Sequence, residues 1–239
     1  MSPASGPLAA VAVALDTGDW ETFRAQCALF GPRVGVLKVG LEAYTRWGPA
    51  AVEEARRSGA RIFLDLKLHD IPNTVLGAVR AAKEHGVDFL TVHAGGGRRM
   101  LAAAAEGAGG TLRLLAVTVL THLDAAGLAE LDLPGGAPER AVAWARLARE
   151  AGCHGAVCSP RELGGMRSAL PPPFVLVTPG IRGLGSVAGD DQRRVATPET
   201  ALADGSDLLV IGRPLTAAED PSAALAELAA RLARRPATR

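Results

Sequence analysis

The chain is organised around residues 61–74, which read Arg-Ile-Phe-Leu-Asp-Leu-Lys-Leu-His-Asp-Ile-Pro-Asn-Thr. The apolar residues 62–64 favour a buried strand, and Pro72 ends it, because proline can start a helix but cannot continue a strand ladder. On an extended backbone Asp65 and Lys67 project from the same face, and Asp70 lies beyond the strand end. Because such charges are costly to bury unless they compensate one another, we expect functional residues here.

The charges at the end of this strand have two interpretations. One is a structural ion pair with Asp70 in a helix cap, since ion pairs with a purely structural role also exist. The other is a shared site, because two further apolar runs end in charge: Lys38 lies near the end of the run 34–39, and Asp16 directly follows the run 11–15. Three strand ends that bear charge favour the shared site.

Apolar runs recur along the chain, each followed by an amphipathic, alanine-rich stretch. The alternation predicts parallel strands joined by crossover helices. Eight repeats in 239 residues fit an α/β fold of the (β/α)8 TIM-barrel type, whose usual size is about 250 residues. An open doubly wound sheet is the alternative, but no Gly-x-Gly-x-x-Gly follows the first strand. The expected strands are 11–15, 34–39, 62–66, 89–92, 114–119, 155–158, 175–177 and 208–211, and the expected helices are 20–30, 41–58, 73–85, 98–107, 139–151, 160–169, 198–204 and 217–235.

We expect a single domain over residues 1–239, with residues 1–8 as a flexible leader and residues 125–138 and 171–173 as surface loops. In a barrel of this kind the reactive groups lie at the carboxyl ends of the strands. His93 occupies such a position and is a candidate base, ligand or buried structural histidine. The polar residues at or just beyond strand ends are Asp16, Lys38, Asp65, Lys67, His93, Thr121, Ser159, Arg182 and Arg213.

Two late segments pair glycine with arginine. Residues 209–214 and 178–182 each end a strand in a Gly turn with an Arg, and the loops after strands seven and eight of a barrel commonly bind phosphate. Ordinary turns are the alternative. The two clusters on these two strands favour a phosphate site at Arg182, Gly212 and Arg213, and Gln192 in the polar loop 189–192 is a candidate amide ligand.

Composition limits the partners. Lys plus Arg is 26 against 25 for Asp plus Glu, a net charge of +1, which gives no reason to expect nucleic acid or a membrane surface. No apolar run reaches the roughly 18 residues of a membrane span. The three scattered cysteines, with no Cys-x-x-Cys pair, predict a reducing cytoplasm. No histidines share metal-ligand spacing, and we assign no metal.

Residues 64–74 resemble the signature of orotidine 5'-phosphate decarboxylases, an Asp-x-Lys-x-x-Asp followed by Ile-Pro-x-Thr. The resemblance extends along nearly the whole chain and in the expected order. The matching segments are residues 14–16, 37–40, 92–94, 116–121, 178–182, 194–198 and 211–214.

The resemblance implies loss of CO2 from orotidine 5'-phosphate (OMP), giving uridine monophosphate (UMP), with no metal or organic cofactor. It also implies a homodimer with a shared site. By position, Lys38, Asp65 and Lys67 belong to one subunit, and Asp70, Ile71 and Thr74 are donated by the other. The implied binding residues are Asp16 for the ribose, Thr121 for the pyrimidine, and Arg182, Gln192, Gly212 and Arg213 for the phosphate, and Lys38 is implied both in substrate binding and in catalysis.

The chemistry of these residues agrees with the implied roles. Decarboxylation leaves a carbanion on a ring carbon, which needs a positive charge and a proton donor. Lys67 can supply both, with Asp65 and Asp70 favouring its charged form. Asp65 would also repel the substrate carboxylate in the ground state.

Two other functions compete. Sugar-phosphate decarboxylases and aldolases of the same superfamily share Asp-x-Lys-x-x-Asp but use Mg²⁺, and they have an acid where this chain has Lys38, which argues against them here. A non-catalytic phosphate-binding protein on a barrel scaffold is the second, and the complete motif disfavours it.

Overall fold

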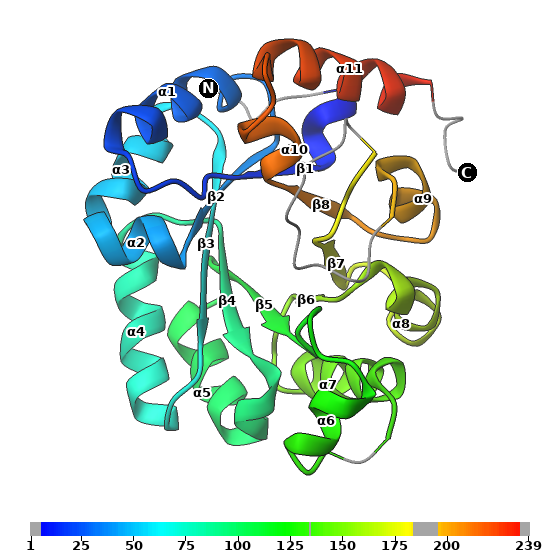
Figure 1. Cartoon of the computed structure of the whole chain (residues 1–239). Coiled ribbons are helices and arrows are strands. Elements are labelled where there is room, and N and C mark those ends of the chain that lie inside the picture. The colour runs from blue at the N-terminus through cyan, green and yellow to red at the C-terminus, as the bar shows by residue number, and fades with distance from the viewer. Residues whose placement is uncertain (1–5, 134, 184–195, 235–239) are drawn as a thin grey trace.

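The computed structural model describes residues 6–133, 135–183 and 196–234. Within them eight parallel strands close into a barrel in which each strand pairs with the next and the last pairs with the first (Figure 1). The expected fold is confirmed, and β3 extends two residues beyond the expected strand 62–66. The strands are β1 (Val11–Ala14), β2 (Val36–Gly40), β3 (Arg61–Leu68), β4 (Phe89–His93), β5 (Arg113–Val117), β6 (Gly155–Val157), β7 (Val175–Thr178) and β8 (Leu208–Ile211).

Side chains alternate between the interior of the barrel and the layer under the helices. In β1, Val11 and Val13 belong to the large core beneath the helices, whereas Ala12 faces inward. The same period of two carries the inward direction from Val36 to Lys38 and from Phe63 to Asp65. The inward cluster consists of Ala12, Val36, Phe63, Phe89, Leu115, Val177 and Leu208.

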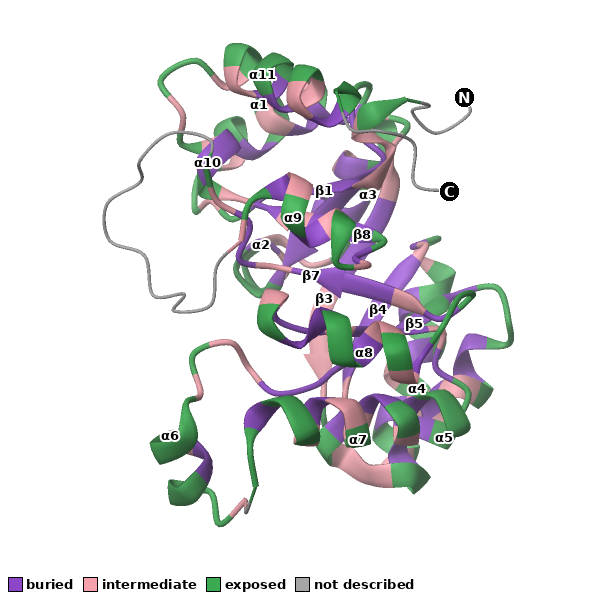
Figure 2. Cartoon of the chain, turned by 90° about the vertical axis from the view of Figure 1, so that its right-hand side faces the viewer, coloured by how far each residue is buried: buried purple, intermediate pink, exposed green. Residues whose placement is uncertain are grey.

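Helices surround the barrel and present their outer faces to solvent, as the green bands in Figure 2 show. Most follow the strands in the expected alternation. They are α1 (Trp20–Phe30), α2 (Leu41–Trp47), α3 (Pro49–Arg57), α4 (Pro72–Glu84), α5 (Gly97–Ala108), α6 (Ala125–Glu130), α7 (Ala137–Glu150), α8 (Leu163–Ala169), α9 (Pro198–Ala203), α10 (Arg213–Thr216) and α11 (Pro221–Ala233), with 3-10 turns η1 (Pro7–Ala10), η2 (Ala94–Gly96) and η3 (Pro160–Glu162).

Three expected elements need correction. The helix expected over 41–58 is broken at Gly48, whose φ of 55° is left-handed and which precedes Pro49. The loop expected over 125–138 contains α6, because the Asp124 carboxylate accepts the N–H of Gly127 and caps a helix there. The helix expected over 217–235 starts only at Pro221, where Asp220 caps it.

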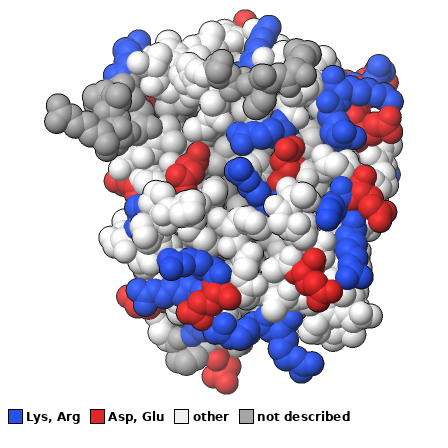
Figure 3. Space-filling view, turned by 180° about the vertical axis from the view of Figure 1, so that it is seen from behind, with Lys and Arg blue, Asp and Glu red and all other residues white. Residues whose placement is uncertain are grey.

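Pro7–Ala10 form η1 and Leu8 packs against the core, so the expected leader 1–8 is ordered at its inner end, while residues 1–5 lie outside the described part. No helix in the described ranges is long and apolar enough to cross a membrane. On the face shown in Figure 3, basic and acidic side chains are interspersed, in keeping with the small net charge.

Candidate active site

A cavity of about 400 Å³ opens at the carboxyl ends of the strands. It brings together residues from β1, β2, β3, β5, β6 and β8 and from the connections after β5 and β7, which are far apart in the sequence. Apolar walls come from side chains that the sequence did not single out, among them Phe63, Val119 and Leu120. The expected site residues that line it are Asp16, Lys38, Asp65, Lys67, Thr121, Arg182, Gly212 and Arg213.

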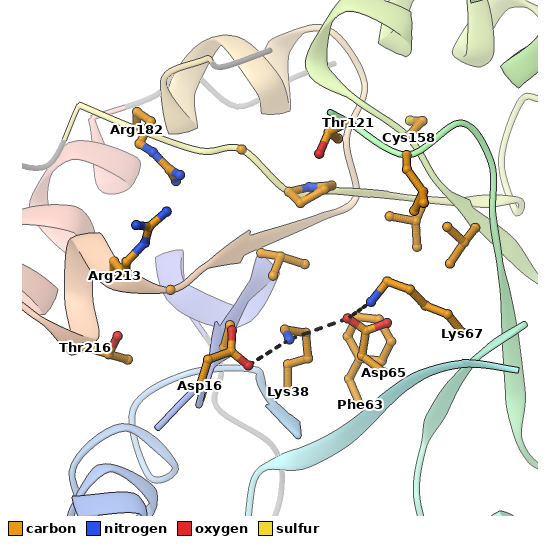
Figure 4. Close-up of a pocket in the computed structure, with 18 of the residues that line it drawn as sticks. Asp16, Lys38, Phe63, Asp65, Lys67, Thr121, Cys158, Arg182, Arg213 and Thr216 are labelled. Atoms are coloured by element: carbon orange, nitrogen blue, oxygen red, sulfur yellow. Dashed lines mark hydrogen bonds and ion pairs between the residues drawn. The ribbon is translucent and has the colours of Figure 1, made fainter. Parts of the chain in front are cut away.

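Charges of alternating sign form one side of the cavity. Lys38 Nζ lies 3.4 Å from Asp16 Oδ1 and 3.5 Å from Asp65 Oδ2, and Lys67 Nζ lies 3.0 Å from the same Asp65 oxygen. Figure 4 shows this row of carboxylates and ammonium groups. The Lys38 side chain is 9% exposed and that of Asp65 is 13% exposed, whereas Lys67 keeps 34% exposure toward the cavity.

The two inner members of this row, Lys38 and Asp65, are held in their charged forms by their neighbours. Burial alone would lower the pKa of Lys38, but Asp65 and Asp16 outweigh it and hold that pKa above its ordinary value of 10.5. Burial would likewise raise the pKa of Asp65, but Lys38, Lys67 and hydrogen bonds from Lys67 and Thr91 hold it below 3.8. The cavity therefore has its fixed charges in place before a ligand arrives.

The backbone of β3 departs from regular geometry where Lys67 enters the site. Lys67 has a φ of 51°, in the left-handed region that residues other than glycine seldom adopt, at a cost of about 1–3 kcal/mol. We expected Asp65 and Lys67 to share a face because the strand is extended. They do meet, but that reason was wrong, because the strand is irregular between Leu64 and Leu68.

The opposite side of the cavity is cationic. The guanidinium groups of Arg182, after β7, and Arg213, after β8, are directed toward one another in Figure 4. Arg182 also donates to the carbonyl of Ile181 at 2.9 Å. Gly212 is the N-cap residue of α10, the short helix that follows β8. A ligand that spans the cavity would meet paired guanidinium groups at one end and the alternating charges at the other.

Comparison with known proteins identifies the family. Residues 9–228 match the profile of the orotidine 5'-phosphate decarboxylase / HUMPS family. The chain belongs to this family. It is 54% identical over 227 residues to "Orotidine 5'-phosphate decarboxylase" of Thermobifida fusca (strain YX), covering 94% of this chain and 96% of the relative. It is 52% identical over 217 residues to the protein of the same name from Anaeromyxobacter sp. (strain K), covering 90% and 95%.

Solved structures agree with this family membership. The crystal structure of orotidine 5'-phosphate decarboxylase from Lactobacillus acidophilus superposes with a TM-score of 0.80 at 35% identity, covering 94% of this chain and 99% of that one. At that level of identity the likeness extends beyond the barrel architecture. The expected family resemblance is therefore confirmed.

In this orotidine 5'-phosphate decarboxylase / HUMPS family chain, Asp70, Ile71 and Thr74 do not line the cavity. They follow β3 at its exposed end. There the Asp70 carboxylate accepts the N–H of Ile71 at 2.6 Å, and α4 begins after Ile71 with no side-chain hydrogen bond as a cap. Ile71 is 67% exposed. Their assignment to a neighbouring subunit stays a prediction, and Gln192 lies outside the described residues.

In this family member His93 does not line the cavity that contains the row of alternating charges. Its ring stacks on His69 with centroids 5.1 Å apart and meets the edge of Trp144, and its Nδ1 accepts the N–H of Gly95. Burial, then the nearby His69 and Lys67, lower its pKa. Of the three roles considered, the structural one fits these contacts. Among the described residues no three His, Cys, Asp or Glu side chains are grouped as a metal site.

Thr91 is a residue that the sequence reading missed. It is fully buried in β4, and its hydroxyl lies between the backbone of Lys67 and the carboxylate of Asp65. The available signal was a hydroxyl residue inside an otherwise apolar strand, with inward-facing Phe89 two positions before it.

Proposed function

We propose that this chain is an orotidine 5'-phosphate decarboxylase, which converts OMP to UMP and CO2 without a metal or organic cofactor. The observation on which the proposal rests is the alternation of Asp16, Lys38, Asp65 and Lys67 along one side of the cavity, with paired guanidinium groups opposite (Figure 4). A nucleotide with a phosphate at one end and a ring carboxylate at the other matches this distribution of charge.

The substrate is oriented by its two ends. Arg182, Gly212 and Arg213 hold the phosphate, together with Gln192 from the loop after β7. Asp16 and Lys38 bind the ribose hydroxyls, and Thr121 binds the pyrimidine. Because the phosphate contacts are remote from the reacting carbon, their binding energy can be used to orient the ring against Lys67.

Lys67 is the reactive group. The bond between C6 and the carboxyl carbon breaks, CO2 leaves, and the electron pair stays on C6. The Lys67 ammonium stabilises this carbanion and then transfers a proton to C6. Its partial exposure allows it to regain a proton from water. Asp65 stands close to the substrate carboxylate and repels it before the bond breaks.

We further propose a homodimer in which Asp70, Ile71 and Thr74 complete the neighbouring site. Among the described residues the large apolar side chains with high exposure are Leu41, Ile71 and Leu131. Each lies in a connection that follows the carboxyl end of a strand, which is the end that holds the cavity. Such a surface supports association through that end of the barrel. We place this enzyme in cytoplasmic pyrimidine biosynthesis.

The alternative is a Mg²⁺-dependent sugar-phosphate decarboxylase or aldolase of the same superfamily. The family profile that matches this chain is named for both orotidine 5'-phosphate decarboxylase and HUMPS. The Lys38 ammonium lies 3.5 Å from Asp65. A Mg²⁺ site would need an acidic ligand at this position, and a lysine supplies a positive charge there instead. This contact disfavours the alternative.

The test is the fall in ultraviolet absorbance of OMP with purified protein in EDTA. We expect turnover in the parent and a loss of about 10³-fold or more in Lys67→Ala, since proton transfer and charge stabilisation are both removed. Lys83→Ala is the matched control, because Lys83 is the third and last lysine of the chain and is exposed on α4. An inactive parent that gains activity only with Mg²⁺ would contradict the proposal.

A further inference from the structure

The pairing of β3 with β4 is interrupted beside the reactive lysine. Leu64 pairs with Leu90 and Leu68 pairs with Val92, so three residues of β3 face a single residue of β4. That residue is Thr91. At such an irregularity backbone N–H groups lose their regular ladder partners, and a buried N–H that is left unpaired is strongly destabilising.

The Thr91 hydroxyl replaces the missing backbone hydrogen-bond partner of Lys67. It accepts the backbone N–H of Lys67 at 2.9 Å and donates its own hydrogen to Asp65 Oδ1 at 2.9 Å. Thr91 is 0% exposed, so water does not compete for either bond. One side chain therefore ties the backbone of the reactive lysine to the carboxylate beside it.

These two hydrogen bonds orient the Asp65 carboxylate and the backbone of Lys67. With Oδ1 held by Thr91, the Oδ2 atom of Asp65 is presented to the ammonium groups of Lys67 and Lys38 at 3.0 and 3.5 Å. The left-handed backbone of Lys67 persists only if its surroundings compensate the strain. The hydrogen bond to Thr91 is the contact that holds its N–H in that conformation.

We propose that Thr91 is a positioning residue for decarboxylation: its hydroxyl sets the Lys67 backbone and the Asp65 carboxylate in the geometry that the reaction requires. The inference rests on the proposed function and adds a residue to it. Thr91 does not line the cavity and does not touch the reacting atoms. A purely structural role, in which the hydroxyl only satisfies a buried N–H, predicts a loss of stability with unchanged chemistry.

Three variants separate these roles. Thr91→Val keeps the shape and removes the hydroxyl, and Thr91→Ser keeps the hydroxyl. Thr118→Val is the matched control, because Thr118, which directly follows β5, is also 0% exposed and its hydroxyl donates to the backbone carbonyl of Val157 in β6, at 2.8 Å. Thermal unfolding of each variant shows how much stability each hydroxyl provides.

We expect kcat of Thr91→Val to fall by about 10- to 100-fold, since small displacements of catalytic groups have effects of this size. KM should change by less than about threefold, because the phosphate contacts remain intact. Thr91→Ser should recover most of the parent kcat, and Thr118→Val should retain it.

The pH profile supplies a second readout. The groups that face Asp65 are Lys38 from β2, Lys67 from β3 and Thr91 from β4. Loss of the Thr91 hydrogen bond removes one of the contacts that lower the pKa of Asp65 against its burial. The acid limb of kcat/KM in Thr91→Val should therefore move to higher pH, and that of Thr118→Val should not.

Parent-like kcat and pH profile in folded Thr91→Val overturn the inference, as does an equal loss of kcat in Thr118→Val. If Thr91→Val does not fold, Thr91→Cys takes its place, because a thiol is a weak donor of similar size. Its kcat should lie below that of Thr91→Ser, and an equal kcat in the two variants overturns the inference.

The activity of the parent separates this inference from the proposed function. A parent that does not decarboxylate OMP overturns the proposed function as well, whereas an active parent beside an unimpaired Thr91→Val overturns this inference alone.

Discussion

Two of the three lysines in this chain, Lys38 and Lys67, are in the barrel interior. Isolated ammonium groups are not stable at such positions. They are tolerated here because Asp65 faces both and Asp16 faces Lys38. The residues of the row therefore depend on one another, and a change in one removes a contact of its neighbours.

Gly40 leaves the space in which two members of this row meet. A Cβ at this position would lie 2.7 Å from Asp16 Oδ1 and 2.9 Å from Lys38 Nζ. Gly40→Ala should therefore displace both groups and lower kcat/KM for OMP by about 10-fold, with little change in Tm, because both side-chain ends can move. Gly77→Ala is the control, since its Cβ would meet nothing within 4 Å on α4, and it should leave turnover unchanged. Equal kcat/KM in the two variants would contradict this account.

Asp65 links the charge row to the pH dependence of stability. Its pKa is below 3.8 in the folded protein, so its ionised form stabilises the fold above pH 3.8, and this stabilisation is lost as the pH falls through the lower folded value. Asp65→Asn should reduce the free energy of unfolding at pH 7 by about 3 kcal/mol, because it leaves the buried Lys38 ammonium with the half-exposed Asp16 as its remaining counter-charge.

The difference between Asp65→Asn and the parent should shrink as the pH is lowered toward and below 3.8. Chemical unfolding of both proteins, from pH 7 down to the lowest pH at which the parent still folds, measures this difference. A gap that stays constant below pH 3.8 would contradict a lowered pKa of Asp65 in the folded protein.

Contacts between helices set the position of the phosphate side of the cavity. Arg231 of α11 forms a two-pronged ion pair with Glu199 of α9, at 2.6 and 2.8 Å, and donates to the carbonyl of Gly183. The hydrogen bonds from Arg231 lower the pKa of Glu199 to about 2. Gly183 directly follows Arg182, so α11 supports the segment that bears one of the proposed phosphate ligands.

Arg231→Ala should lower the free energy of unfolding by about 1–2 kcal/mol, because the ion pair with Glu199 is only partly exposed. The KM for OMP should rise as well. Arg80→Ala removes an exposed ion pair between α4 and α5, 3.1 Å long, and should change stability by less than about 0.5 kcal/mol. Calorimetry and steady-state kinetics on the two variants test this, and equal effects would contradict it.

A single barrel contains most, but not all, of the residues of the proposed site. Asp70, Ile71 and Thr74 point to a second copy, since they belong to the signature and lie outside the cavity of their own chain. The proposed dimer therefore has two sites, each built from both subunits.

Mixing inactive Lys67→Ala with inactive Asp70→Ala protein tests this arrangement. In a mixed dimer one site has both substitutions and the other has neither, so random exchange should restore about one quarter of the parent activity. Mass analysis of differently tagged subunits verifies the exchange. Exchange without recovery of activity would exclude the shared site.

Much of this protein could be read from local patterns. The alternation of apolar runs with amphipathic stretches predicted the barrel, because each strand and helix has its own periodicity. The same period of two indicates that Lys38 and Asp65 face inward, and the motif in residues 64–74 identified the family. The break at Gly48 and the cap at Asp124 were missed because the signals are single residues within longer helical or loop-like stretches.

The contacts that make the site were decided by tertiary structure. Lys38 meets Asp65, and Thr91 meets Lys67, only because β2, β3 and β4 lie side by side in one particular register. That register depends on how the barrel closes and packs, which involves residues far apart along the chain. Periodicity is a property of neighbours in the sequence, so it indicates which side of a strand a residue occupies but not which residue of the next strand it will contact.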